Sequence, residues 1–229
     1  MQVSVVVPIH NEAAILQRAL PMLLAEMAEV DATVDIALVE NGSTDATLSM
    51  ARSHAAAHSA LAVLSLSEPD YGAAMRAGFL AAEGDWVVNF DIDYFAGSFV
   101  TAALATDADV VVASKRVAGA NDTRGVLRRV ATWGFNLLIR TLFRVTVTDT
   151  HGMKALKRAV VADIGPNVIS TKDLFDTELV IRAEKAGYRI AEIPAKVVET
   201  REARSGLWTR VPRTVIGLFR LRIAMWRRG

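Results

Sequence analysis

Short apolar runs alternate with longer stretches of helical pattern along the first half of the chain. The runs are nearly continuous and rich in β-branched residues, which is typical of strands in a sheet that is covered on both faces. They occupy residues 3–7, 34–39, 61–66, 86–90 and 110–113. Helical patterns lie between them, at residues 12–29, 44–58 and 72–83. This alternation predicts an α/β fold with a mostly parallel sheet, whose ligands bind beyond the carboxyl ends of the strands.

The pattern is looser after residue 114. It predicts a loop at residues 119–122, helices at 126–143 and 173–186, and a strand at 189–198. Pro194 cannot donate a ladder hydrogen bond, so we expect this last strand near a sheet edge. No internal repeat and no long linker divides the sequence. We therefore expect one domain over residues 1–206 and a C-terminal helix over residues 207–229.

Composition fits an ordinary globular domain. Of the 229 residues, 52% are hydrophobic and 22% are charged, which excludes a disordered or fibrous chain. The absence of cysteine excludes a disulfide framework and thiolate chemistry, and makes the cytoplasm the default expectation. Residues 1–8 lack the basic region of a signal peptide and favour a buried strand. No uncharged apolar run reaches about 18 residues, so we expect no membrane-spanning segment.

Charge is divided unevenly along the chain. The net charge is +1, from 26 Lys and Arg against 25 Asp and Glu. Residues 1–200 hold 18 basic and 24 acidic side chains, a balance of −6, whereas residues 201–229 hold eight Arg and one acidic residue, a balance of +7. Because an exposed charge acts within a Debye length of about 8 Å, the basic end can meet anionic partners that the net charge conceals.

Polar side chains follow the first two predicted strands. Residues 8–12 lack the glycines of a dinucleotide fingerprint or a P-loop, which argues against those phosphate cradles. Glu40 ends the second strand, where its carboxylate could accept a hydrogen bond from a ribose or a base. A turn and helix cap at residues 41–43 explains the same pattern, and both interpretations stay open.

The fourth strand runs straight into two carboxylates. Residues 87–90 are apolar enough to be buried, and Asp91 and Asp93 follow them directly. Two carboxylates at this spacing repel each other unless a cation offsets their charge. Hard oxygen ligands suit Mg²⁺ or Mn²⁺, which bind through one or two carboxylates, several waters and substrate phosphates.

Taken together, these motifs resemble the family 2 inverting glycosyltransferases of GT-A fold. The segments that carry the resemblance are residues 8–12, 39–45, 72–84 and 91–93. Later motifs resemble the polyprenyl-phosphate (dolichol-phosphate) sugar synthases within that family. They lie at residues 113–116, 149–154, 176–179, 186–190, 192–194 and 201–205.

The resemblance implies transfer of one sugar from a nucleotide-sugar donor to the phosphate of a membrane polyprenol. It assigns Asp91, Asp93 and Arg201 to the catalytic centre, with Asp91 and Asp93 holding Mg²⁺ or Mn²⁺ on the donor's diphosphate. The donor site that it implies consists of Pro8, Asn11, Glu12, Glu40, Asn41, Asp70 and Asp91. The residues implied for the acceptor phosphate are Ser114, Lys115, Arg116, Arg124, Arg128, Arg201, Arg204 and Ser205.

Two departures from the family pattern bear on these roles. The usual Asp-Asp-Gly-Ser stands here as Glu40-Asn41-Gly42-Ser43, so the contact with the base could be reshaped. The usual Gly-Ser-Arg stands as Ala113-Ser114-Lys115-Arg116, which leaves open whether Lys115 or Arg116 meets the acceptor phosphate.

The acceptor decides whether the enzyme needs a general base. A sugar hydroxyl must lose its proton during attack, whereas a phosphate is already anionic at neutral pH. Asp176 and Glu178 are the candidate bases for a hydroxyl acceptor. Both also suit a structural role as acidic residues at a helix start, where the helix dipole favours them.

The C-terminal residues form a basic helical pattern. A helix over residues 208–228 would place eight apolar side chains on one face: Trp208, Val211, Val215, Leu218, Phe219, Ile223, Met225 and Trp226. Five arginines lie opposite, and Arg222 falls inside the apolar stripe. This pattern predicts a helix in an anionic membrane interface, with helix 126–143 as a second wall of a lipid entrance. Docking on the domain, or on a second copy in a homo-oligomer, is the alternative.

The sequence therefore predicts a peripheral enzyme on the cytoplasmic, inner face of the cell membrane, and no nucleic-acid partner. Mannose from GDP-mannose is the first expectation for the donor and glucose from UDP-glucose the second. The rival functions are a family 2 transferase for a soluble or glycan hydroxyl and a non-catalytic lipid-binding protein at the membrane surface.

Overall fold

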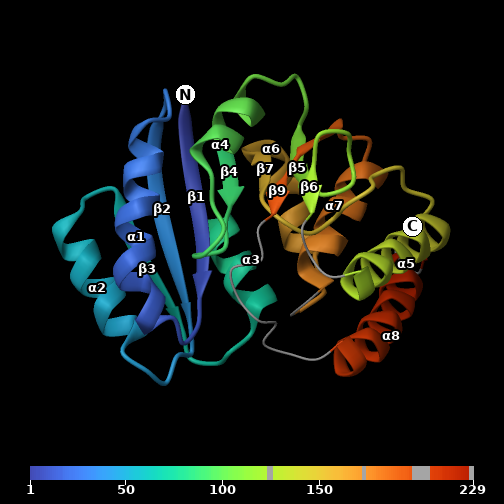
Figure 1. Ribbon diagram of the computed structural model, residues 1–229, viewed down its shortest axis with the longest axis horizontal. Helices are drawn as coiled ribbons and strands as arrows, with labels where there is room; N and C mark the ends of the chain where they lie inside the picture. The colour runs from blue at the N-terminus through green and yellow to red at the C-terminus, as the bar shows by residue number, and fades with distance from the viewer. Residues whose placement is uncertain (123–125, 172–173, 198–206, 227–229) are drawn as a thin grey trace.

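The computed structural model describes residues 1–122, 126–171, 174–197 and 207–226 (Figure 1). A sheet of seven strands forms its centre, in the order β3-β2-β1-β4-β7-β5-β8. Its strands are β1 (Gln2–Ile9), β2 (Thr33–Asn41), β3 (Leu61–Leu66), β4 (Trp86–Asn89), β5 (Val110–Ser114), β7 (Lys154–Lys157) and β8 (Ile190–Pro194). Only β7 runs antiparallel to its neighbours, β4 and β5, so the predicted mostly parallel sheet is confirmed.

Helices cover both faces of this sheet, as the continuous apolar strands predicted. They are α1 (Ala13–Ala28), α2 (Thr47–Ala57), α3 (Tyr71–Ala81), α4 (Gly97–Leu104), α5 (Val126–Phe143), α6 (Arg158–Ile164), α7 (Phe175–Lys185) and α8 (Leu207–Trp226), with a 3-10 turn at Gly165–Asn167. Buried side chains of α1, α2 and α4 pack with one face of the sheet. Those of α3, α5, α6, α7 and α8 pack with the other.

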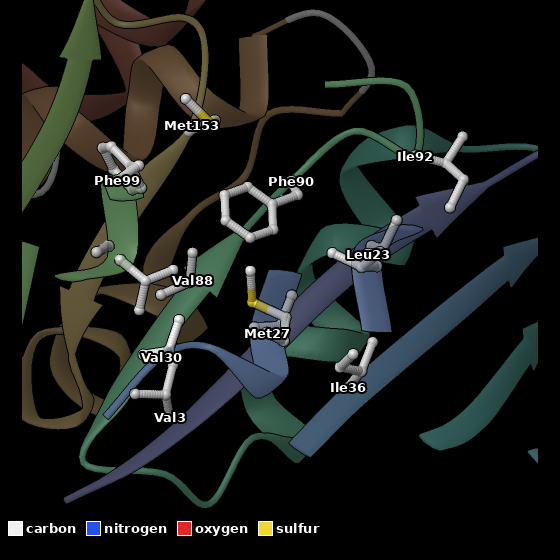
Figure 2. Packing of buried hydrophobic residues seen from close by; sticks show 14 of the residues in the cluster. Val3, Leu23, Met27, Val30, Ile36, Val88, Phe90, Ile92, Phe99 and Met153 are labelled. Carbon is white, nitrogen blue, oxygen red and sulfur yellow. The ribbon is translucent and has the colours of Figure 1, made fainter. Parts of the chain in front are cut away.

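Strand β4 shows how alternation divides the core. Val88 and Phe90 point to the α1 side, where Figure 2 shows them beside Met27 and Phe99. Val87 belongs to the opposite cluster. Because side chains alternate along a strand, Asn89 also lies on the side of α3 and α7. A polar residue therefore enters the core two positions before Asp91, where the predicted metal-binding turn begins.

Helix α3 packs closely against β1 and β2, and this packing places its first turn near the carboxyl ends of these strands. A Cβ atom on Gly78 would lie 2.3 Å from Val6 Cγ1, so only glycine permits this approach. The helix begins at Tyr71, and Asp70 caps it by accepting from the Ala73 N–H at 3.0 Å. The sheet thus fixes where Tyr71 lies relative to the loops after β1 and β4.

Three elements from α4 onward were not predicted by the hydrophobic pattern. Helices α4 and α6 and strand β7 lie outside every predicted range, since β7 begins and ends with lysine and shows no apolar run. The predicted loop at 119–122 is wrong at its end, because Asn121–Asp122 form strand β6 and pair with β9, Lys196–Val197. Ala195 separates β9 from β8, and β8 occupies the sheet edge that Pro194 predicted.

Helix α8 docks on the domain with one of its faces. A Cβ atom on Gly217 would lie 2.3 Å from Leu174 Cδ1, and Leu218 and Leu221 are buried. The prediction that Leu218 and Met225 face lipid is therefore wrong, because both pack in the cluster around α7. The exposed apolar row of α8 consists of Ile216, Phe219, Ile223 and Trp226.

No helix within the described parts of the chain is both long and apolar enough to cross a membrane. The boundary predicted between residues 206 and 207 stays a prediction.

Candidate active site at the carboxyl ends of the strands

The loops after β1 and β2 are joined by hydrogen bonds. Asn11 has a φ of 53°, and its Oδ1 accepts from the Thr44 N–H at 2.8 Å while its own N–H donates to Ser43 Oγ at 3.0 Å. The buried Glu12 donates its backbone N–H to the Thr47 hydroxyl at 2.8 Å. The structure thus brings together two segments of the predicted donor site, beside the half-buried Pro8 at the end of β1.

Glu40 lies inside the turn that follows β2. One of its carboxylate oxygens accepts from the Ser43 N–H, and the other accepts from the Ser65 hydroxyl at 2.7 Å. Burial acts to raise the pKa of Glu40, but these hydrogen bonds hold it below its ordinary value. The side chain is 2% exposed. This arrangement favours the turn interpretation of the Glu40 motif.

Asn41 continues this support toward α3. Its Oδ1 accepts from the Asp70 N–H at 2.7 Å, and Asp70 in turn caps α3. Four predicted donor residues, Asn11, Glu40, Asn41 and Asp70, are therefore parts of one hydrogen-bonded edge. Each of these four side chains accepts at least one hydrogen bond from a backbone N–H group, which holds the edge in place.

Asp91 and Asp93 follow β4 in a tight turn, which the Tyr94 N–H closes by donating to the Asp91 carbonyl oxygen at 2.9 Å. Both side chains are exposed. The pKa of Asp91 is nevertheless raised to about 6, first because the surrounding protein atoms desolvate it and then because Asp176 and Asp93 repel its charge. Lys154 and Lys115 oppose this shift. The turn therefore concentrates negative charge that a cation would offset.

The carboxylate oxygens of Asp91 and Asp93 are of a kind that suits a magnesium or manganese ion. Among the described residues, no group of three or more His, Cys, Asp or Glu side chains could hold a metal. Asp91 and Asp93 would offer two exposed hard oxygen ligands to such an ion, which takes its remaining ligands from water and substrate phosphate. The site thus suits an ion that arrives with, or is completed by, a diphosphate.

A buried ion pair lies behind this turn. Lys154 Nζ is 3.0 Å from Asp176 Oδ1 and donates to the Gly152 carbonyl at 2.8 Å. The Tyr71 hydroxyl donates to Asp176 Oδ2 at 3.0 Å. Burial raises the pKa of Tyr71 well above its ordinary value, and Asp176 and Asp91 add to the shift, so the hydroxyl keeps its proton. The sequence did not predict a role for Tyr71 or for Lys154. The only available signal was the positive charge of Lys154 within the motif at residues 149–154.

Glu178 is fully buried and held by three donors. Its Oε1 accepts from the Ile169 N–H at 3.1 Å and from Arg182 Nε at 2.6 Å, and its Oε2 accepts from the Ser170 N–H at 2.6 Å. These contacts join α7 to the segment before it. They support the structural interpretation of Glu178.

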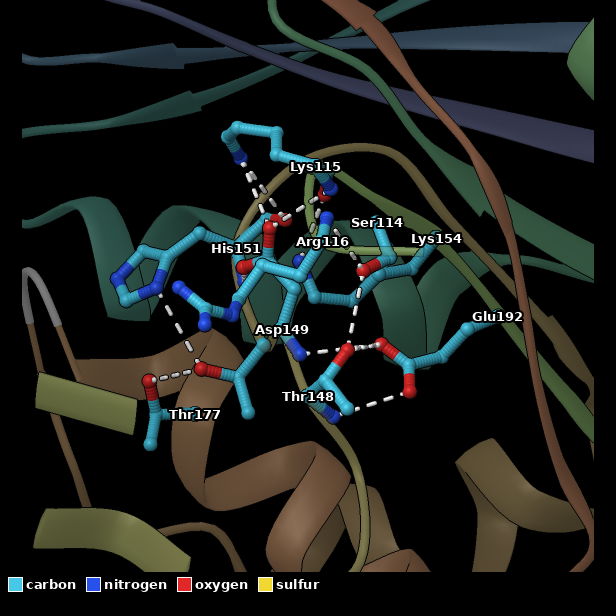
Figure 3. A network of polar contacts seen from close by, with 11 residues as sticks. Ser114, Lys115, Arg116, Thr148, Asp149, His151, Lys154, Thr177 and Glu192 are labelled. Atoms are coloured by element: carbon cyan, nitrogen blue, oxygen red, sulfur yellow. Dashed lines mark hydrogen bonds and ion pairs between the residues drawn. The ribbon is translucent and has the colours of Figure 1, made fainter. Parts of the chain in front are cut away.

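A network at the end of β5 gathers the later motifs (Figure 3). Ser114 is buried, and its Oγ accepts from the Arg116 N–H at 3.2 Å and lies 3.3 Å from Thr148 Oγ1. Glu192 accepts from the Thr148 hydroxyl at 2.7 Å and from the Asp149 N–H at 3.0 Å. Ser114 therefore braces the strand end.

The remaining residues predicted to bind the acceptor phosphate differ in burial, and several lie outside the described residues. Lys115 is half-buried and Arg116 is exposed at the end of β5. Arg128 belongs to α5. Arg124, Arg201, Arg204 and Ser205 lie outside the described residues.

Residues 4–165 match the family model described as glycosyl transferase family 2. The chain belongs to this family. It is 33% identical over 196 residues to an uncharacterized glycosyltransferase of Mycobacterium tuberculosis, covering 83% of each chain. It is 28% identical over 212 residues to the undecaprenyl-phosphate mannosyltransferase of Micrococcus luteus, covering 87% of this chain and 84% of the relative.

Solved structures show the same GT-A fold. A mannosyltransferase of Pyrobaculum calidifontis in complex with GDP-Man and Mn²⁺ aligns with a TM-score of 0.65 at 23% identity, over 99% of this chain and 64% of that one. Glucosyl-3-phosphoglycerate synthase of Mycobacterium tuberculosis, in complex with Mn²⁺ and UDP, aligns with a TM-score of 0.65 at 21% identity, over 96% and 79% of the two chains. The chain is therefore a family 2 glycosyltransferase whose relatives include enzymes named for polyprenyl-phosphate acceptors.

Proposed function

We propose that this glycosyltransferase moves one hexose from a nucleotide-diphosphate sugar to the phosphate of a polyprenol, with inversion at the anomeric carbon. The likeness to the undecaprenyl-phosphate mannosyltransferase supports this acceptor class, as does a dolichyl-phosphate hexose transferase of Haloferax volcanii, 30% identical over 198 residues. Mannose from GDP-mannose is the first donor to test, and glucose from UDP-glucose the second.

The observation that carries the proposal is that both candidate bases, Asp176 and Glu178, already form ion pairs and hydrogen bonds within the protein. Glu178 is surrounded by protein donors, and Asp176 is paired with Lys154 and hydrogen-bonded to Tyr71. A carboxylate paired with a buried ammonium is a poor proton acceptor, because protonation would leave the ammonium uncompensated. A phosphate acceptor removes the need for a base, since its oxygen is already anionic.

The reaction then follows from charge and position. An acceptor phosphate oxygen attacks the anomeric carbon while the bond from that carbon to the nucleotide diphosphate breaks, so that the glycosyl phosphate forms and the nucleoside diphosphate leaves. Asp91 and Asp93 would hold a divalent ion, which supplies positive charge to the leaving diphosphate. The edge formed by the loops after β1 and β2 orients the nucleoside, and the cations beyond β5 offset repulsion between the two anionic substrates.

The exposed faces of α5 and α8 support action at a membrane surface. The two helices contact each other and lie side by side in Figure 1. On α5 the exposed apolar side chains are Val126, Val130, Trp133 and Leu137, beside a pocket lined in part by Arg129. On α8 the exposed Arg213, Arg220 and Arg222 flank the apolar row defined above. Apolar rows flanked by arginine suit an anionic lipid interface, which supports our proposal that the enzyme acts on the inner face of the membrane.

A donor screen tests the proposal. The purified 229-residue protein is mixed with undecaprenyl phosphate, Mg²⁺ or Mn²⁺, and radiolabelled GDP-mannose or UDP-glucose, and the label is followed into the lipid phase. We expect one donor to label the lipid and EDTA to abolish the transfer. No labelled lipid with either sugar, alongside efficient transfer to a soluble glycan, would replace the proposal with the hydroxyl-acceptor function. Lipid binding without metal-dependent nucleotide binding would favour the non-catalytic alternative.

A further inference from the structure

The Lys154–Asp176 ion pair lies behind the turn that carries the proposed metal ligands. We propose that Asp176 supplies a third negative charge to the divalent-ion site from outside the ion's ligand shell, and that Lys154 and Tyr71 are positioning residues that hold its carboxylate there. This inference rests on the metal-dependent transfer proposed above. It gives Asp176 an electrostatic role toward the ion in place of a role as general base.

The register of the sheet brings this pair to the metal turn. Asn89, the last residue of β4, is the Cα partner of Lys154 in the antiparallel pairing of β4 with β7. Asp91 follows Asn89 two residues later along the chain. Because Lys154 Nζ lies 3.0 Å from Asp176 Oδ1, the first turn of α7 is held against the strand end from which the metal turn continues.

Both carboxylate oxygens of Asp176 are held by protein groups. Oδ1 pairs with the Lys154 ammonium, whose side chain has no exposed surface, and Oδ2 accepts from the Tyr71 hydroxyl at 3.0 Å. The ammonium is fixed further by its donation to the Gly152 carbonyl at 2.8 Å. A cation and a hydroxyl donor both favour the charged form of a carboxylate. The pair and the tyrosine thus keep a fixed negative charge beside the metal turn.

The charge of Asp176 reaches the metal turn. Repulsion by Asp176 raises the pKa of Asp91 more than repulsion by the neighbouring Asp93 does, and Lys154 opposes the shift with a smaller effect. The charges of Asp176 and Asp91 also raise the pKa of Tyr71, so its hydroxyl lies in the field of both carboxylates. The ion pair therefore acts on Asp91 as a dipole with its negative end nearer. A potential that repels a second carboxylate attracts a divalent cation to the same place.

An outer charge matters at this site because the turn itself offers little. In the part of the chain that the structure describes, no cluster of three potential ligands forms, and Asp91 and Asp93 are exposed to solvent, which screens their charge. Asp176 is not free to join them as a ligand, since both of its oxygens are engaged. Its side chain is only 10% exposed, so its charge is screened less. Loss of a group outside the ligand shell typically lowers metal affinity about 10- to 100-fold.

The first arm of the test measures Mn²⁺ binding without an acceptor. The double variant Lys154→Met/Asp176→Asn removes both members of the pair, so that no buried charge is left unpaired. The matched control Lys157→Met/Asp109→Asn removes the ion pair at the other end of β7, where Lys157 Nζ lies 2.9 Å from Asp109 Oδ1. Loss of the free Mn²⁺ signal in electron paramagnetic resonance gives the Kd, with Mn²⁺ alone and with Mn²⁺ and GDP or UDP.

We expect the Lys154→Met/Asp176→Asn protein to have a Mn²⁺ Kd about tenfold above wild type, and the control to stay within about twofold. Tyr71→Phe keeps every charge and should raise the Kd only about threefold, through the lost hydrogen bond. The inference is overturned if the Lys154→Met/Asp176→Asn protein binds Mn²⁺ with the wild-type Kd, or if the control shows the same rise. If that double variant does not fold, a wild-type Kd in Tyr71→Phe overturns the inference.

The second arm measures transfer to undecaprenyl phosphate at increasing Mn²⁺ concentration. The Lys154→Met/Asp176→Asn protein should need about tenfold more Mn²⁺ for its half-maximal rate and reach a kcat within about threefold of wild type at saturating Mn²⁺, because added metal restores a weakened ion site but not a lost base. A rate that stays a hundredfold low at saturating Mn²⁺ would overturn the inference in favour of a general base. If the wild-type protein binds Mn²⁺ but transfers no sugar to the lipid, the proposed function fails, while the first arm still decides this inference.

Discussion

Lys154 Nζ lies 3.0 Å from Asp176 Oδ1, and the Lys154 side chain has no exposed surface. This pair joins β7, the antiparallel strand of the sheet, to the first turn of α7. Asp176 also helps to raise the pKa of Asp91, whereas Lys154 opposes that shift. The ion pair is therefore both a contact within the core and part of the electrostatic surroundings of the proposed metal ligands.

Removing the carboxylate of this pair should destabilise the fold. In Asp176→Asn the buried Lys154 ammonium loses its counter-ion, and we expect the free energy of unfolding in urea to fall by about 3 kcal/mol. The double variant Lys154→Met/Asp176→Asn should recover much of the loss. If Asp176→Asn is as stable as wild type but has no transfer activity, Asp176 acts as a general base and the acceptor is a hydroxyl group.

Glu178→Gln should act through stability alone. The substitution removes the charge that faces Arg182 in a buried position, so the free energy of unfolding should fall by about 3 kcal/mol. At a temperature where the variant is folded, kcat should stay within about threefold of wild type. A kcat reduced a hundredfold in the folded variant would give Glu178 a chemical role.

Asp91→Asn should stabilise the metal-free protein at neutral pH. The native pKa of about 6 lies above the ordinary value of 3.8, so the charged side chain costs stability above pH 6, and the cost disappears as pH falls from 6 toward 4. Because solvent screens this exposed carboxylate, we expect a gain of only about 1 kcal/mol at pH 7.5 and little gain near pH 4. Urea unfolding in EDTA measures both values.

The same variant should lose the effect of metal. Mn²⁺ with a nucleotide diphosphate should raise the melting temperature of wild-type protein and leave that of Asp91→Asn nearly unchanged, since one of two carboxylate ligands is gone. Equal stabilisation of both proteins would show that the ion binds elsewhere.

The two faces of α8 should respond differently to substitution. Phe219→Glu/Ile223→Glu changes exposed positions, so flotation with anionic liposomes should fall at least fivefold while the melting temperature stays within about 2 °C of wild type. Leu218→Ala removes a buried side chain and should cost about 3 kcal/mol of stability. Undiminished liposome binding by the double glutamate variant would refute the interfacial role of this row.

The amino-acid sequence by itself determined the alternating strands and helices of the first half apart from α4, the edge position of the strand with Pro194, and the pair Asp91 and Asp93 after β4. These features are local: strand alternation, proline's missing N–H and the spacing of two carboxylates are all set by neighbouring residues. The ordered motifs also identified the glycosyltransferase family, which the comparisons confirmed.

Only the tertiary structure decided which polar side chains form hydrogen bonds or ion pairs with distant parts of the protein. Glu40 meets Ser65 from another strand, Lys154 meets Asp176 across 22 positions, and Lys115 meets Asp149 across 34. It also decided that Leu218 of α8 faces the protein. Whether a charge is available to a substrate, or a leucine to a lipid, depends on contacts between segments far apart in the chain. Such contacts are set by packing, which periodicity and motif spacing do not encode.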